Sequence, residues 1–279
     1  MKISRVGIVA KSNSEEAARV AVEIGSFLSK RGVEVVSSPE VPPAKGWRTS
    51  PPEGMSADLV IVVGGDGTIM RTAQRVGETP ILGVKVGALG FLCETTPDRA
   101  LETLECVLEG RTFLEFKTRL SVTCGGTCLP DALNEVLITS SRPSKIMRLS
   151  VSANGKPIHR GMADGVIVST TTGSTAYALS AGGPLVDPGL DVLELVFICP
   201  LNRGLRPILF PTSTRIEVEV LSDASSGLVV VDGQTSMDIR ERSLIAMERS
   251  ERPAVFLHTS LPSFYEKASR MLNLGLGIH

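Results

Sequence analysis

Five consecutive apolar residues, Leu59 to Val63, lead directly into Gly64-Gly65-Asp66-Gly67-Thr68. A continuous apolar run of this length is typical of a strand in a parallel sheet that is covered on both faces. Ligands of such sheets bind beyond the carboxyl ends of the strands, which is where the glycines stand. The run therefore predicts an open α/β domain with a ligand site at the end of this strand.

The residues around this strand fit the same architecture. Hydrophobic periodicity predicts strands at residues 5–10, 33–36 and 80–86, and helices at residues 14–30, 69–76 and 97–110. Ser14 is the expected cap of the first helix, and Ala18, Val22, Phe27 and Leu28 recur along it at steps of three and four residues. Residues 37–57 contain five prolines and predict a long surface loop. The alternation of strands and helices implies parallel strands with right-handed crossovers.

The character of the sequence changes near residue 115. Short runs rich in β-branched residues then follow at close intervals, at residues 120–124, 136–139, 149–153, 165–169, 208–210, 216–221 and 228–231. Few helical stretches separate these runs, which indicates a β-rich second domain. We therefore predict an α/β domain at residues 1–115, a β-rich domain at 116–252, and a C-terminal strand and helix at 253–279 that pack back on the first domain.

Composition narrows the class of protein. The chain has 29 Lys and Arg against 30 Asp and Glu, so it lacks the basic excess of proteins that bind nucleic acid. No apolar run approaches the ~20 residues of a membrane span, and the first residues do not form a signal peptide. An odd number of scattered cysteines fits reduced thiols. We expect a cytoplasmic protein with neither nucleic acid nor a membrane as partner. With only three histidines, a catalytic base is expected to be a carboxylate.

The glycines around Asp66 indicate an anion site. Their backbone N–H groups can approach a phosphate closely, and the helix that follows directs its positive end to the same place. A carboxylate there repels an anion unless it handles a proton or a metal, so a general base for phosphoryl transfer fits Asp66. The alternative is a plain tight turn, because Asp-Gly and Gly-Gly are common turn pairs. The usual G-x-G-x-x-G and Walker patterns do not occur, since Met70 replaces the third glycine and no Gly-Lys-Ser/Thr is present.

Three later stretches carry further polar groups. They are Asn134-Glu135, the segment from Asp164 to Tyr177 with its hydroxyl-rich turn, and Asp232-Gly233-Gln234. Hydroxyls between Ser169 and Thr175 can bond to sugar and phosphate while the Tyr177 ring covers a base. The alternatives are an ordinary loop at 169–177 and a hairpin turn at Asp232-Gly233.

Taken in order, these four stretches resemble the signature series of the NAD kinase family. Three more stretches are similar to that family, namely Gly90-Phe91-Leu92, Ala181-Gly182-Gly183-Pro184 and Arg206-Pro207-Ile208-Leu209. The resemblance runs from about residue 3 to residue 274. It implies the fold shared with diacylglycerol kinases, in which an α/β N-terminal domain with an open, mostly parallel sheet precedes a β-rich C-terminal domain.

The resemblance also implies an activity and a set of site residues. The activity is transfer of the γ-phosphoryl group of ATP, or of a phosphoryl group of polyphosphate, to the 2′-hydroxyl of the adenosine ribose of NAD. Asp66 would be the catalytic base, and Gly64, Gly65, Gly67 and Thr68 would form the phosphate loop. The residues that would bind NAD are Asp66, Gly67, Arg71, Asn134, Glu135, Lys145, Asp164, Thr175, Ala176, Tyr177, Ser180 and Gln234. Mg²⁺ or another divalent cation would accompany the donor, no residue is expected to be a permanent metal ligand, and the assembly would be a homodimer or homotetramer.

Two other functions stay open at this point. A lipid kinase of the diacylglycerol type shares the glycine–aspartate loop, although it would need an apolar channel for its acceptor. A non-catalytic NAD(H) sensor would keep the binding surface, although a pure binder gains nothing from a carboxylate beside phosphates. Assays with NAD and with diacylglycerol separate the first alternative, and binding without turnover would identify the second.

Overall fold

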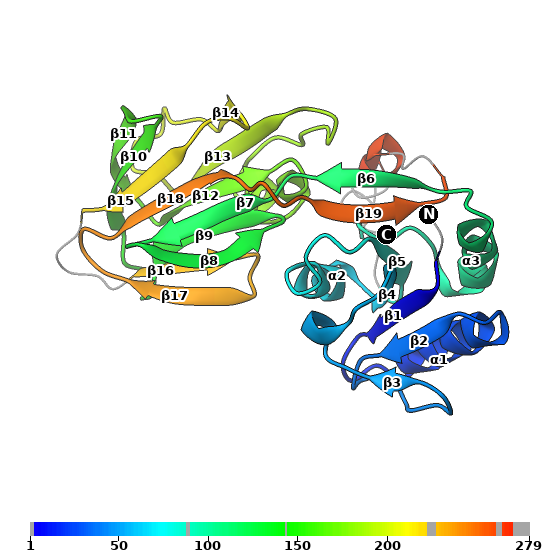
Figure 1. Cartoon of the computed structure of the whole chain (residues 1–279). Coiled ribbons are helices and arrows are strands. Elements are labelled where there is room, and N and C mark those ends of the chain that lie inside the picture. The colour runs from blue at the N-terminus through cyan, green and yellow to red at the C-terminus, as the bar shows by residue number, and fades with distance from the viewer. Residues whose placement is uncertain (1–2, 88–89, 143, 222–226, 261–263, 270–279) are drawn as a thin grey trace, which may run out of the picture. The chain divides into compact units, whose positions relative to one another are not determined.

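A computed structural model of the chain describes residues 3–87, 90–142, 144–221, 227–260 and 264–269. The chain divides into two compact units (Figure 1). The first unit comprises the residues up to Phe116 together with those from Ala254 onward, and the second unit comprises Lys117–Pro253. No helix in the described ranges is long and apolar enough to cross a bilayer.

A seven-stranded sheet forms the centre of the first unit (Figure 1). Its order is β3-β2-β1-β4-β5-β19-β6. The bounds are β1 (Arg5–Ala10), β2 (Glu34–Ser37), β3 (Arg48–Thr49), β4 (Leu59–Gly64), β5 (Ile81–Lys85), β6 (Phe113–Lys117) and β19 (Ala254–His258). The pairs from β3 through to β19 are all parallel. The order reverses between β1 and β4, so the glycines that follow β4 lie at the switch point of the sheet, the usual ligand position in open α/β folds.

Helices and short 3₁₀ turns of the first unit stand between its strands, and a further helical stretch at residues 264–269 follows them. Those between the strands are α1 (Glu15–Lys30), α2 (Asp66–Ala73), α3 (Ala100–Leu108), η1 (Pro52–Gly54) and η2 (Pro97–Arg99). Helices α1 and α3 share one apolar core with alternate residues of β1, β4 and β5. Helix α2 packs on the other face, where the absent side chain of Gly83 leaves room for Ile69. All five residues Leu59 to Val63 are fully buried, as the predicted α/β architecture requires.

Three local predictions in this unit were correct only in part. Ser14 does cap α1, because its hydroxyl accepts from Ala17 N at 3.2 Å. Leu28 is buried as expected, and Val22 and Phe27 are half-buried and pack against the core. Ala18 is only half-buried, because the centre of the buried face runs through Ala17 and Ala21. Helix α2 begins at Asp66 rather than at residue 69. The expected loop at 37–57 contains β3 and η1, since residues 48 and 49 pair with the edge of β2.

The second unit consists of two six-stranded antiparallel sheets. One has the order β11-β10-β15-β18-β7-β8 and the other β14-β13-β12-β9-β16-β17. The bounds are β7 (Leu120–Cys124), β8 (Thr127–Ala132), β9 (Glu135–Ser140), β10 (Met147–Ala153), β11 (Lys156–Ala163), β12 (Gly165–Thr170), β13 (Val192–Ile198), β14 (Ile208–Pro211), β15 (Ile216–Val220), β16 (Gly227–Val231), β17 (Thr235–Ile239) and β18 (Leu244–Arg249). Alternate residues of both sheets meet in one large apolar core.

The outer face of the second sheet carries a small helical cover. The turn η3 (Gly173–Thr175) and the helix α4 (Tyr177–Ser180) follow β12 directly. Ala178 of α4 packs on Ile167 of β12 and Val196 of β13. Strand β12 is therefore buried on both faces, which is unusual for an antiparallel sheet and explains why Gly165 to Thr170 has no polar alternation.

The C-terminal segment belongs to the first unit. Strand β19 lies between β5 and β6 in the first sheet, and Phe256 is the register partner of Ile81. Residues 264–269 are helical, and the remainder of the helix expected at 262–274 lies outside the described residues. The Lys267 ammonium donates to the carbonyls of Phe91 at 2.8 Å and Cys93 at 3.2 Å.

Candidate active site

The first group of candidate residues surrounds the carboxyl end of β4. Helix α2 starts at Asp66, and the carbonyl of Gly65 accepts from Thr68 N at 2.9 Å and Ile69 N at 3.2 Å. A Cβ atom added at Gly65 or Gly67 would meet no atom within 4 Å, so both glycines present open backbone. At Gly64, in contrast, a Cβ would come within 2.8 Å of Thr68 Oγ1, so a side chain does not fit there. The loop is thus closely packed at Gly64, while the backbone at Gly65 and Gly67 is free to contact a ligand.

The Asp66 carboxylate is held in one orientation by backbone donors. Its Oδ2 accepts from Phe91 N at 2.7 Å, and its Oδ1 accepts from Leu92 N at 3.2 Å. A Cβ atom at Gly90 would collide with this carboxylate, so only glycine allows the close approach. The stretch Gly90-Phe91-Leu92 therefore supports Asp66 directly. Each carboxylate oxygen has a further lone pair with which it can accept a proton from a substrate.

A cavity of about 250 Å³ opens beside this loop, at the switch point between β1 and β4. Val9 and Ala10 at the end of β1 form one wall, and Thr68 and Arg71 from α2, with Arg75 in the turn after it, form another. The structure therefore brings Thr68 and Arg71 of the candidate set together at the same edge as Asp66.

The second group of candidate residues, which we call the Asp232 cluster, consists of Asp232 and the segment Leu133-Asn134-Glu135 to which its carboxylate is hydrogen-bonded. Asp232 follows β16 with a φ of 50° and opens the hairpin turn to β17, so the hairpin reading of Asp232-Gly233 is correct. Its buried carboxylate accepts from the backbone N–H groups of Leu133 at 2.8 Å, Asn134 at 2.8 Å and Glu135 at 3.1 Å. Gln234 Nε2 donates to the Asp232 carbonyl at 3.3 Å. Asp232 thus joins two of the candidate stretches, a role the sequence analysis did not predict.

The hydroxyl-rich turn after β12 packs against Asn134. Ser169 Oγ donates to the Asn134 carbonyl at 3.2 Å, and Thr170 Oγ1 donates to the Leu133 carbonyl at 2.6 Å. Gly173 lies so close to the Asn134 carbonyl that a Cβ atom would collide with it. Thr175 Oγ1 donates to the Thr172 carbonyl at 3.1 Å. In these contacts the hydroxyls stabilise the turn itself, and they bring its backbone next to Asn134 and Glu135.

Several candidate residues of this unit face solvent. Tyr177 is 43% exposed, Ser180 and Gln234 are exposed, and Ala176 is half-buried at the start of α4. Asp164 is exposed just before β12, where Thr139 Oγ1 donates to its carbonyl at 3.1 Å. The length of β12 separates Asp164 from Ser169 by about 17 Å at ~3.4 Å per residue. Lys145 is exposed in the turn before β10, and no described contact joins it to the Asp232 cluster.

Two buried atoms of this cluster have no hydrogen-bond partner among the described residues. They are Asn134 Oδ1 and Glu135 Oε2. Burial, together with the charge of Asp232, raises the pKa of Glu135 to about 7. Leaving a buried polar atom unpaired costs on the order of 1–3 kcal/mol, so these two acceptors indicate a place for a ligand that brings N–H or O–H groups.

A third acidic residue, Glu194 of β13, lies in the same row of the sheet. Glu135, Ser169 and Glu194 are direct register partners on β9, β12 and β13, so their side chains share one face. Glu194 is 1% exposed, neither carboxylate oxygen has a partner among the described residues, and burial raises its pKa to about 7. Gly183 lies against this carboxylate, where a Cβ atom would collide with Oε1. Nothing in the local sequence marked Glu194, because its burial depends on the cover by α4 and Gly183.

Comparison with known proteins places both units in one family. The family model of the ATP-NAD kinase N-terminal domain matches residues 6–112, and that of the ATP-NAD kinase C-terminal domain matches residues 133–259. The NAD kinase of Methanothermobacter thermautotrophicus is 37% identical over 274 residues, covering 96% of each chain. The NAD kinase of Methanosarcina mazei is 35% identical over 277 residues, covering 98% of this chain and 95% of its own.

Solved structures agree with this assignment. An NAD kinase from Archaeoglobus fulgidus in complex with ATP is 30% identical, with a TM-score of 0.78 and coverage of 99% of this chain and 100% of its own. Yeast NADH kinase complexed with NADH has a TM-score of 0.90, with coverage of 100% and 90%, and at 24% identity it supports the fold alone. The chain therefore belongs to the NAD kinase family, the enzymes that use ATP to phosphorylate NAD.

Proposed function

We propose that the chain transfers the γ-phosphoryl group of a nucleoside triphosphate to the 2′-hydroxyl of the adenosine ribose of NAD, with Asp66 as the general base. The observation that supports this most is the Asp66 carboxylate itself. It is fixed by Phe91 N and Leu92 N between two glycines whose backbone is open to a ligand. A fixed carboxylate beside backbone donors suits a hydroxyl that must lose a proton as it attacks a phosphorus atom.

The protein forms no covalent bond to the transferred phosphoryl group in this reaction. Asp66 takes the proton of the 2′-hydroxyl while the oxygen forms its bond to the γ-phosphorus, and the bond from that phosphorus to the leaving oxygen breaks. Catalysis then depends mainly on positioning and on neutralising the phosphate charge. The described residues contain no cluster of three or more His, Cys, Asp or Glu that could hold a metal. Mg²⁺ or another divalent cation is proposed to accompany the donor, since Mg²⁺ is usually bound by one or two carboxylates together with the phosphates of the substrate.

Recognition of the acceptor is proposed to use the Asp232 cluster. Asn134 Oδ1 and Glu135 Oε2 are the buried acceptors that adenosine N–H and O–H groups would satisfy. Thr175, Ala176, Tyr177 and Ser180 border the same turn, and Arg71, Lys145 and Gln234 complete the proposed NAD contacts. Asp164 is proposed to bind the nicotinamide carboxamide, because the length of β12 separates it from the adenosine contacts as the two ends of a dinucleotide require.

The test of this function is NADP formation from NAD, with ATP and with inorganic polyphosphate as donors. We expect NADP with at least one donor and no phosphorylation of diacylglycerol. Phosphorylation of diacylglycerol in place of NAD would contradict the proposal and favour a lipid kinase. Binding of NAD without NADP formation in the presence of ATP and Mg²⁺ would identify a sensor instead.

Assembly and location are also proposals. We propose a homodimer or homotetramer in the cytoplasm, on the basis of the family resemblance. Light scattering of the purified chain at several concentrations measures the assembly, and a monomer at all concentrations would contradict it.

Asn134→Ala should weaken NAD binding. Removal of the amide leaves a ligand donor unpaired in a buried site, which costs on the order of 1–3 kcal/mol of binding free energy. Calorimetric titration with NAD measures the change. The exposed Asn202 provides a matched control, because Asn202→Ala lies outside the Asp232 cluster and should keep the wild-type affinity. Equal affinities of both variants would remove Asn134 from the site.

Asp164→Ala should lower kcat/KM for NAD by on the order of tenfold, the loss of one charge-assisted hydrogen bond. Because binding energy from the nicotinamide end helps to place the 2′-hydroxyl, turnover should fall along with affinity. Free adenosine lacks that end, so any weak reaction with adenosine should be unchanged. Steady-state assays with both acceptors distinguish the cases, and an equal fall for both would assign Asp164 to the fold.

A further inference from the structure

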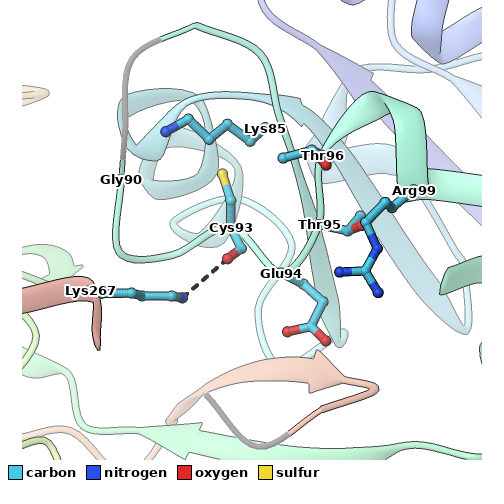
Figure 2. Close-up of a pocket in the computed structure, with 8 residues that line it drawn as sticks. All are labelled: Lys85, Gly90, Cys93, Glu94, Thr95, Thr96, Arg99 and Lys267. Atoms are coloured by element: carbon cyan, nitrogen blue, oxygen red, sulfur yellow. Dashed lines mark hydrogen bonds between the residues drawn. The ribbon is translucent and has the colours of Figure 1, made fainter. Parts of the chain in front are cut away.

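A second cavity, of about 240 Å³, lies within the first unit at the same edge of the sheet (Figure 2). Its basic side chains come from three separate elements: Lys85 ends β5, Arg99 ends η2 before α3, and Lys267 belongs to the C-terminal helix. Cys93 and Thr96 also line it. The cavity is smaller than the ~300–1,000 Å³ of pockets that hold whole drug-sized ligands, so it suits a small ion or the end of a larger molecule.

The position of Lys85 connects this cavity with the phosphate loop. Strands β4 and β5 are parallel, and Lys85 is the direct register partner of Gly64. Neighbouring strands lie about 4.8 Å apart, so the two backbones are immediate neighbours at the carboxyl edge of the sheet. This is the edge at which ligands of open α/β sheets bind. A group in the cavity would therefore lie one strand away from the glycines.

The cavity and Asp66 also share a wall. Phe91 N and Leu92 N donate to the Asp66 carboxylate, while the carbonyls of Phe91 and Cys93 accept from the Lys267 ammonium. Gly90 and Cys93 of this segment line the cavity. The same few residues that orient the base are thus anchored by one of the basic groups of the cavity.

The charge of the cavity is positive although the whole chain has a net charge of -1. Its one acidic residue, Glu94, is already paired, because Glu94 Oε2 lies 2.7 Å from His258 Nδ1 and Glu94 Oε1 accepts from Thr259 N at 2.8 Å. Burial opposes ionisation of Glu94, but the hydrogen bonds from His258 and Thr259 outweigh it and lower the pKa of Glu94. Burial also opposes the charged form of His258, but hydrogen bonds to Glu115 and Glu94 outweigh it and raise its pKa. His258 lies between Glu94 and Glu115, so its positive charge is shared by two carboxylates. Arg99 Nε lies 3.6 Å from Glu102 Oε2 in an exposed ion pair, which is weak and can yield to a phosphate. Three basic side chains against one carboxylate therefore leave the described lining of the cavity positive.

We propose that this cavity binds a short oligophosphate, the phosphate tail of the phosphoryl donor, next to Asp66. The inference rests on the proposed function and assigns the donor side of the same site. Lys85 supplies a point charge, and the planar guanidinium of Arg99 can bond two phosphate oxygens at once. The tail of a nucleoside triphosphate and inorganic polyphosphate share this linear phosphoanhydride chemistry, so both are sources of the ligand.

Steady-state kinetics with Lys85→Gln, Arg99→Gln and the double variant test the assignment. In the double variant we expect the KM for the donor to rise by on the order of tenfold or more, while the KM for NAD stays within about twofold. The exposed Lys45 lies outside the cavity, so Lys45→Gln is the matched control for loss of one positive charge. A rise for ATP alone or for polyphosphate alone supports the site and identifies its source. An unchanged KM for both donors overturns it.

Direct binding separates this inference from the proposed function. Inorganic tripolyphosphate is titrated calorimetrically into the NAD-free chain, where we expect binding with one-to-one stoichiometry that weakens at least tenfold in the double variant and weakens as salt rises. Equal affinity of the wild type and the double variant, or no binding, overturns the site. If the wild type forms NADP but the variants keep the donor KM, only this inference fails. If the wild type forms no NADP, the proposed function fails, and the titration still reports on the cavity.

Discussion

Asp66→Asn should lower kcat by on the order of 10²- to 10⁴-fold, the usual cost of removing a general base. The amide has the shape of the carboxylate but cannot take the proton of the 2′-hydroxyl. NAD affinity should change little, because the variant removes an interaction that matters mainly in the transition state. Steady-state assays of NADP formation give kcat, and rapid-quench measurements give the rate constant of the chemical step. Calorimetry gives the affinity for NAD.

The control for Asp66→Asn must separate loss of the base from loss of the loop. The Asn side chain keeps one oxygen for Phe91 N or Leu92 N but places an NH₂ group toward the other donor. Circular dichroism and thermal unfolding should therefore accompany the kinetics. Asp238→Asn is a matched exchange at an exposed position of β17, outside the proposed NAD and donor contacts, and should leave kcat unchanged. A near-normal kcat in a folded Asp66→Asn would exclude Asp66 as the base.

Glu194→Gln should stabilise the chain at pH 8 by up to about 3 kcal/mol and should have little effect at pH 4.5. Burial raises the pKa of Glu194 from 4.5 to about 7 in the folded chain. The folded state therefore holds a proton that the unfolded state releases, so stability falls as pH rises from about 4.5 to about 7 and stays lower above that. Each unit of pKa corresponds to about 1.4 kcal/mol, which gives the upper limit for the neutral glutamine.

Urea unfolding of wild type and Glu194→Gln at pH 4.5, 6 and 8 measures this difference. The difference in the free energy of unfolding between the two proteins should grow from pH 4.5 to about 7 and should stay constant above that. The exposed Glu251 of the same unit gives the control. Glu251→Gln removes a carboxylate from the surface and should not produce this dependence of stability on pH. A Glu194→Gln stabilisation that is independent of pH would show that the carboxylate is charged or paired throughout.

The strand before Asp66 could be predicted from the sequence because burial on both faces leaves a continuous apolar run. Seven strands of the second unit were predicted from short runs of β-branched residues, although strands such as β7, β15 and β16 are buried on one face only. The strands β8, β11, β13, β17 and β18 were missed. Strands β8 and β11 are the two edges of their sheet and contain Pro130 and Pro157. Proline is tolerated at edges, where its missing N–H need not pair, but it interrupts the pattern by which a strand is recognised.

Some site residues could be predicted from the sequence and others could not. The stretches that carry Asp66, Asn134 and Glu135 are visible in the sequence because glycines and polar residues interrupt apolar runs there. The role of Asp232 in holding the segment with Asn134 and Glu135 could not be predicted. Its carboxylate accepts from backbone N–H groups that lie 97 to 99 positions earlier in the chain. Glu194 looks like an ordinary residue of an alternating strand until α4 covers its face. Both depend on contacts that only the folded chain creates.

The place of β19 in the first sheet has a consequence for synthesis on the ribosome. Strand β6 lies beyond β19, so the sheet of the α/β unit has no neighbour for β6 until residues 254–258 have been translated. The second unit, Lys117–Pro253, is continuous in sequence and can be completed first. At roughly 5–20 residues per second, its translation takes roughly 7–30 s, during which the first unit waits with an open sheet edge. We therefore expect the part of the protein that begins the chain to be the last to complete its sheet. A nascent chain that stops before residue 254 carries the phosphate loop on a sheet that lacks β19.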